Sequence, residues 1–121
     1  MPEVIVRYQV GFLREADIDS LRTLIPEIVA QHLSVPGTDA ELTPSDIEVI
    51  FQEAGKFDVT QEYVFRMTIS SNYSPEREAI CKKAKSAIAD RLSEEDFFLR
   101  KTILEKAFVW IRLSPGWFIE F

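Results

Sequence analysis

The sequence repeats one pattern twice at an almost constant spacing, and this repeat constrains the fold more than any other feature. Three segments of the first half each have a similar segment 59 or 60 residues later. The matched pairs are residues 4–7 (VIVR) with 63–66 (YVFR), 32–34 (HLS) with 91–93 (RLS), and 46–50 with 106–110. We therefore expect two similar units, residues 1–60 and 61–121, within a single domain that covers residues 1–121.

The first unit reads as strand, helix, strand. Residues 1–10 are rich in β-branched and aromatic side chains, which is typical of a strand. Apolar residues then recur with helical spacing from about Glu15 or Asp17 to Leu33, and a second strand is expected over residues 47–51. Pro26 falls inside the helix, where it removes a backbone donor, so we expect it to kink the helix or divide it in two.

The second unit repeats the order. A strand over residues 63–69 precedes Ser74-Pro75, a capping serine followed by proline at the first helical position, so the helix is expected to begin there and to run to Leu92. Residues 94–105 are expected to add a helical turn that buries Phe97 and Leu99. Residues 107–113 then form the last long strand, and the apolar tail, residues 116–121, is expected to dock on a sheet edge as a short strand.

Two β-α-β units predict an α+β fold, a two-layer α/β sandwich in which a four-stranded mixed sheet carries both helices on one face. Strands as apolar as 4–10 and 107–113 are expected to be buried on both faces, so an oligomer is the natural cover for the other face. An alternative with the same order of elements is a ferredoxin-like module that binds a small ligand. In that module the two units would be intertwined with antiparallel strand pairing.

Charge and cysteine content exclude several classes of function. Fourteen Lys and Arg against 20 Asp and Glu give a net charge of -6, which argues against nucleic-acid and anionic membrane partners. The cationic cluster of Lys82, Lys83, Lys85 and Arg77 reads as a solvated helix face. A single cysteine, Cys81, rules out an internal disulfide and a cysteine-based metal site, and we expect neither a metal nor a cofactor. Because no segment resembles a signal peptide or a membrane span, we expect a cytoplasmic protein.

The chain opens with Met1-Pro2 directly before its first strand. If Met1 is removed, Pro2 becomes a secondary amine at the edge of an apolar core and a candidate base. If Met1 is retained, the Pro2 nitrogen is an amide without useful basicity, and the residue only starts the strand.

These features together resemble the tautomerase superfamily, which includes macrophage migration inhibitory factor and 5-carboxymethyl-2-hydroxymuconate isomerase. The resemblance spans nearly the whole chain and rests on Met1-Pro2 opening an apolar strand, on the repeated β-α-β unit, and on residues 42–49 (LTPSDIEV) leading into a strand. Residues 14–17 (READ) with the mid-helix Pro26 look most like the isomerase branch.

The resemblance implies a homotrimer with active sites near Pro2 at the subunit boundaries. It implies that Pro2 acts as general base in keto-enol isomerisation of a small carboxylated or aromatic substrate, its pKa lowered by an apolar pocket. Cations would then hold the substrate carboxylate and the enolate oxygen. The candidates for substrate binding are Arg7, Arg66, Trp110 and Arg112. Alternatively, the arginines pair with Glu3, Glu48 or Glu53 on the sheet surface, and the tryptophan belongs to a core or an interface.

The sequence also departs from the superfamily pattern. Where 4-oxalocrotonate tautomerase has a substrate-binding arginine in its second strand, this chain has Glu48 in the first unit and Phe108 in the second. A second hypothesis is therefore an oligomer that has the fold but no catalytic activity.

Overall fold

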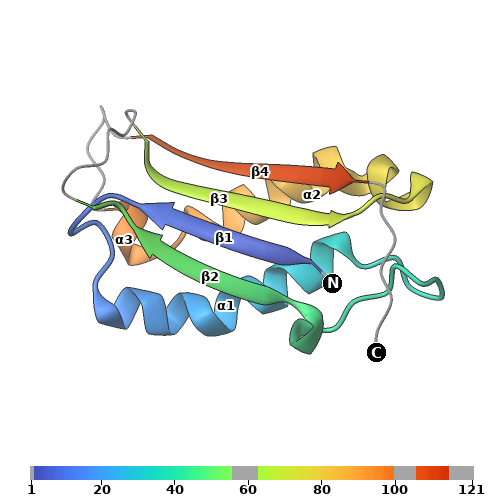
Figure 1. Ribbon diagram of the computed structural model, residues 1–121, viewed down its shortest axis with the longest axis horizontal. Helices are drawn as coiled ribbons and strands as arrows, with labels where there is room; N and C mark the ends of the chain where they lie inside the picture. The colour runs from blue at the N-terminus through green and yellow to red at the C-terminus, as the bar shows by residue number, and fades with distance from the viewer. Residues whose placement is uncertain (1, 56–62, 100–105, 115–121) are drawn as a thin grey trace.

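The computed structural model describes residues 2–55, 63–99 and 106–114, and its elements follow the expected β-α-β order twice (Figure 1). In chain order they are β1 (Glu3–Tyr8), α1 (Glu15–Leu33), the 3-10 turn η1 (Pro44–Asp46), β2 (Glu48–Glu53), β3 (Tyr63–Asn72), α2 (Pro75–Leu92), α3 (Asp96–Leu99) and β4 (Lys106–Ser114). Among the helices of these described ranges, none is long and apolar enough to cross a membrane.

The four strands form one mixed sheet in the order β2-β1-β3-β4. Strands β1 and β2 pair in parallel, as do β3 and β4, whereas β1 and β3 are antiparallel neighbours. The two units therefore lie side by side, and the predicted α+β sandwich is confirmed. Strand order excludes the ferredoxin-like alternative, because β1 and β2 are direct neighbours and no strand lies between them. The expected C-terminal strand falls outside the described residues.

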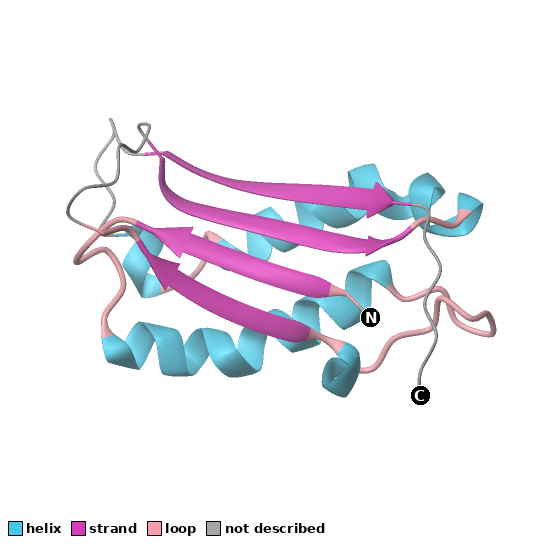
Figure 2. Cartoon of the chain, in the orientation of Figure 1, coloured by secondary structure: helices cyan, strands magenta, loops and turns pink. Residues whose placement is uncertain are grey.

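Helices α1 and α2 cover the same face of the sheet, so the protein has two layers (Figure 2). The core lies between these layers. Strand residues with even numbers in β1, Val4 and Val6, are fully buried, while the odd-numbered Ile5 and Arg7 are not. This alternation follows from the two-residue period of a strand, and it fixes which side chains point toward the helices.

Helix α1 is a single continuous helix that contains Pro26, so of the two effects expected of this proline, a kink or a division, the division does not occur. Proline in a helix interior costs about 3 kcal/mol. The apolar residues on both sides of it compensate, because Leu21 and Ile25 before it and Ile28 and Val29 after it are all buried against the sheet. Tertiary burial thus outweighs the local preference.

The start of α2 confirms the sequence prediction. Ser74 is the N-cap, its Oγ accepts a hydrogen bond from the Arg77 backbone N–H at 3.1 Å, and Pro75 is the first helical residue. This cap also fixes the position of Arg77 in the first turn of α2, from which its side chain reaches the end of β3.

Replacing Ser74 with alanine is expected to lower the free energy of unfolding by about 1 kcal/mol, because one backbone donor of the first turn loses its acceptor. Chemical unfolding at fixed protein concentration measures this change. Ser86→Ala is the matched control, since Ser86 is an exposed residue in the middle of the same helix. Equal losses in both variants would show that the cap does not stabilise α2.

The predicted helical turn after α2 is present as α3. The ring of Phe98 in α3 packs edge-on against that of Phe65, with centroids 4.9 Å apart, and its centroid lies 6.0 Å from that of Phe12. The expected burial of Phe97 and Leu99 lies outside the described residues.

Candidate active site

Pro2 is buried at the start of β1, at the edge of the core. Its carbonyl accepts a hydrogen bond from the Glu48 backbone N–H at 3.1 Å, which holds the start of β1 against the start of β2. Because side chains alternate along a strand, Pro2 lies on the same face as Val4 and Val6, the face that the helices cover. The position of this residue is therefore set by strand pairing on one side and by the core on the other.

Strand β3 brings a polar group to the same place. The β1–β3 register ends with Glu3 opposite Ser70, and continuing it by one residue places Pro2 across from Ser71. Directly opposite residues of an antiparallel pair have Cα atoms about 5 Å apart. Ser71 is only 8% exposed, and its hydroxyl accepts a hydrogen bond of 2.6 Å from Nη1 of Arg77.

Arg77 is 4% exposed and, with Ser71, makes up the buried polar side chains of the described chain. Its guanidinium donates to four acceptors from three parts of the fold. These are the carbonyl of Leu33 from Nε (3.3 Å), the Ser71 hydroxyl and the carbonyl of Asn72 from Nη1 (2.6 and 3.0 Å), and the carbonyl of Ala40 from Nη2 (2.8 Å). Arg77 thus ties the end of α1 and the following loop to the end of β3, where Ser71 lies across from Pro2.

All four acceptors of Arg77 are neutral groups. Burial lowers the pKa of Arg77, and the Cys81 thiol one turn further along α2 opposes this shift. The pKa of the Cys81 thiol is itself raised, first by burial, with Glu78 adding to the rise and Arg77 opposing it. Within the described ranges, no carboxylate forms an ion pair with Arg77, so a buried positive charge is balanced there by dipoles alone. Such a charge favours a bound anion.

Arg77 was missed by the sequence prediction, which grouped it with Lys82, Lys83 and Lys85 on a solvated face. The three lysines are exposed as predicted, but for Arg77 the prediction is wrong. Helical periodicity contained the signal. Arg77 precedes Cys81, Ala84 and Ile88 by four, seven and eleven residues, so it shares their apolar face and not that of the lysines.

The four residues predicted to bind substrate lie on the opposite face of the sheet from Pro2. Arg7, Arg66, Trp110 and Arg112 share the face that α1 and α2 do not cover, as the strand register and the burial pattern show. Within a single chain, the sheet therefore separates these four side chains from the side chain of Pro2.

On that face the residues form two pairs. Arg7 and Arg66 are direct cross-strand partners at the end of β1 far from Pro2. The Arg7 Nε donates to Gln52 Oε1 at 2.9 Å, and the Arg66 guanidinium lies 6.0 Å from the ring centroid of Phe108. Both arginines thus have partners other than the acidic residues Glu3, Glu48 and Glu53 that the sequence offered.

Trp110 and Arg112 follow each other on the outer face of β4. Trp110 is 58% exposed, and Arg112 lies opposite Ser70, which is itself the partner of Glu3. Arg112 is therefore at the same end of the sheet as Pro2, two strands away.

In the described part of the chain, no cluster of three or more His, Cys, Asp or Glu residues could hold a metal ion.

Comparison with known proteins identifies this architecture. No family model and no curated protein matches the sequence. Solved structures do match. One match is a fused wild-type 4-OT that forms a symmetric trimer. Its TM-score is 0.54 and its sequence identity 17%, and the match covers 93% of this chain and 85% of that one. A member of the cis-3-chloroacrylic acid dehalogenase family has a TM-score of 0.54 and 14% identity, over 94% of this chain and 76% of that one.

A third solved structure, 5-carboxymethyl-2-hydroxymuconate delta-isomerase, matches with a TM-score of 0.50 and 12% identity, over 100% of this chain and 88% of that one. At these identities the likeness concerns the arrangement of the chain. The repeated β-α-β units, the side-by-side sheet and these three matches lead to one conclusion: the chain has the fold of the tautomerase superfamily.

Proposed function

We propose that this chain is a keto-enol tautomerase in which Pro2, freed by removal of Met1, is the general base for a small carboxylated or aromatic substrate. The observation that carries the proposal is the position of Pro2, buried at the start of β1 across from Ser71, whose hydroxyl binds the buried guanidinium of Arg77. The structural likeness to an isomerase and to a member of a dehalogenase family supports it.

The surroundings of Pro2 suit a base. Burial and a nearby positive charge both disfavour the protonated form of a free amine, so the neutral amine is available to accept a proton. Pro2 takes a proton from the carbon α to a carbonyl, and the resulting prolinium returns it elsewhere on the enol. One heteroatom thus moves the proton in both directions, and no cofactor is required for the step.

Arg77 supports the same step through its charge. The developing enolate and a substrate carboxylate are both anions, and a guanidinium that no carboxylate of the described chain neutralises stabilises them in a buried site. A guanidinium has five N–H groups, and four of those of Arg77 are in the hydrogen bonds given above. The fifth, on Nη2, is the donor that we assign to a substrate oxygen.

We further propose that the protein works as a homotrimer. The sheet face without helices carries Ile5, Ile50 and the exposed Trp110 in one row across the strands, and a second copy of the chain can cover them. The fused 4-OT with the same fold is a symmetric trimer. In such an assembly the outward-facing side chains of one subunit, among them Arg7, Arg66, Trp110 and Arg112, would lie against its neighbour.

The proposal is tested by blocking the amine while keeping the proline ring. The Met-free protein is compared with a variant that carries one additional glycine before Pro2, with phenylpyruvate or 2-hydroxymuconate as substrate. The amide nitrogen of the extended variant has no useful basicity, so its rate is expected to fall to the background rate. Equal rates in the two proteins would remove Pro2 from the mechanism.

A second candidate function, a non-catalytic oligomer with this fold, is favoured by one observation. Glu48 is exposed opposite Glu3, and Phe108 packs edge-on against Tyr63 with ring centroids 4.5 Å apart, at the positions where a catalytic relative has arginine. The intact mass of the untagged protein separates the two candidates. A retained Met1 would favour the non-catalytic oligomer.

A further inference from the structure

The end of the molecule far from Pro2 contains a cavity of about 350 Å³. It lies where the end of α2 and α3 meet the first residues of β3 and β4. The described residues that line it include the aromatic Phe65 and Phe98, and the polar groups at its border come from Asp90 and Ser93. Cavities of about 300 Å³ and more are the size at which proteins bind small organic molecules.

The repeat explains why a cavity forms here. The lining residues 89, 92 and 93 of the second unit correspond to residues 30, 33 and 34 of the first unit, and residue 107 corresponds to residue 47. The cavity is therefore the counterpart, in the second unit, of the region near Pro2 in the first unit. In the first unit this place is closed. The Ser34 hydroxyl accepts a hydrogen bond from the Leu42 N–H at 2.7 Å, and Arg77 binds the carbonyls of Leu33 and Ala40. In the second unit the hydroxyl of Ser93, which corresponds to Ser34, instead donates to the carbonyl of Asp90 at 2.7 Å.

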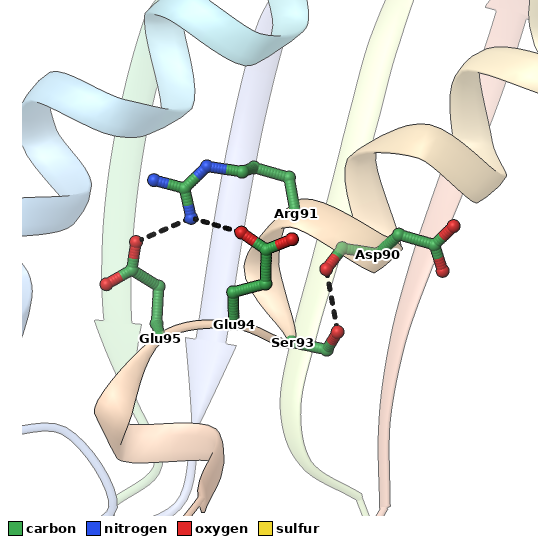
Figure 3. Close-up of polar contacts among 5 residues, drawn as sticks. All are labelled: Asp90, Arg91, Ser93, Glu94 and Glu95. Carbon is green, nitrogen blue, oxygen red and sulfur yellow. Dashed lines mark hydrogen bonds and ion pairs between the residues drawn. The ribbon is translucent and has the colours of Figure 1, made fainter.

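The charges around the cavity favour a cation. The C-terminal end of α2 carries the negative end of the helix dipole, and the Asp90 carboxylate adds a full negative charge beside it. Asp90 forms no ion pair with another described residue. The neighbouring cation, Arg91, is directed elsewhere: its Nη1 lies 3.0 Å from Glu95 and 3.6 Å from Glu94, and Asp90 points away from it (Figure 3).

Aromatic walls add to this preference. The half-buried Phe98, whose ring meets that of the fully buried Phe65 edge to face at 4.9 Å, gives the cavity an aromatic wall. Organic cations bind such surfaces through cation–π attraction. We propose that this cavity is a second small-molecule site, separate from Pro2, that binds a primary amine carrying one aromatic ring.

The test uses 2-phenylethylamine as the probe, with 2-phenylethanol and 3-phenylpropionate as neutral and anionic analogues of similar shape. Backbone amide shifts of the isotopically labelled full chain are recorded during titration with each compound. The amine is expected to produce saturable shifts at residues 89–93 and 107–109. Asp90→Asn is expected to weaken its binding roughly fivefold, as for a partly exposed ion pair, whereas Asp39→Asn in an exposed loop has no effect.

A cavity-filling pair of variants completes the test. Ala89→Phe places a ring at the border of the cavity from an exposed helix position, and Ala79→Phe places the same ring at an exposed position near the other end of α2. We expect Ala89→Phe to abolish the saturable shifts and Ala79→Phe to preserve them. The proposal is overturned if the amine causes no saturable shift, if Ala89→Phe binds it unchanged, or if the alcohol or the carboxylate binds equally well.

Discussion

Replacing Pro2 with alanine in the Met-free protein is expected to lower kcat/KM for tautomerisation by about 10²- to 10⁴-fold, the range that a positioned general base contributes. Alanine keeps an N-terminal amine but loses the ring that is buried at the start of β1. The new amine is less well held, and its proton-accepting atom is no longer fixed against the core. Steady-state kinetics with phenylpyruvate measure the change, and thermal unfolding checks that the variant is folded.

Pro36→Ala provides the matched control for this experiment. Pro36 is an exposed proline in the loop after α1, so its replacement removes a ring of the same kind without touching the start of β1. We expect this variant to retain the activity of the parent protein. If Pro2→Ala and Pro36→Ala are equally active, Pro2 is a strand residue without a catalytic role, and the non-catalytic oligomer becomes the better description.

The parts of this fold that could be predicted are those that local chemistry determines. Ser74-Pro75 marks the start of α2 because a hydroxyl cap and a residue without an N–H satisfy the same first turn. The repeat predicted the pairing of β1 with β2 and of β3 with β4, since a strand, a helix and a strand most simply give a parallel pair. The continuity of α1 through Pro26 was not predictable from its own residues, because it depends on burial against the sheet.

The candidate site was predicted only in part, for a physical reason. Pro2 could be singled out because its chemistry is local to the chain terminus. Its neighbours Ser71 and Arg77 come from the other unit, through the β1–β3 register, which no short-range pattern encodes. Alternation along β1 predicts that Arg7 shares a face with the odd-numbered residues of that strand. Alternation along β4 predicts that Arg112 shares a face with the even-numbered residues of that strand. Which of the two faces the helices cover was not given by that alternation.

Replacing Arg77 with methionine is expected to destabilise the protein by about 2–4 kcal/mol, because the buried Leu33 carbonyl and Ser71 hydroxyl and the partly buried carbonyls of Ala40 and Asn72 lose a donor, and each unsatisfied buried group costs about 1–3 kcal/mol. The removal of a desolvated charge offsets part of this loss. Chemical unfolding at one fixed protein concentration measures the difference, since assembly would otherwise change the apparent stability. Lys83→Met, at an exposed position of the same helix, is the control and is expected to have little effect.

Arg77→Lys separates the two roles assigned to this residue. Lysine keeps the positive charge but cannot reproduce the planar set of donors that reaches four acceptors in three segments. If the anchor is what matters, both variants lose stability, and the loop after α1 is no longer tied to the end of β3. If the charge also supports catalysis, Arg77→Lys retains more kcat than Arg77→Met when both are assayed at a temperature where they are folded. A stability of Arg77→Met within about 0.5 kcal/mol of the parent, the range of ordinary surface substitutions, would contradict the anchoring role.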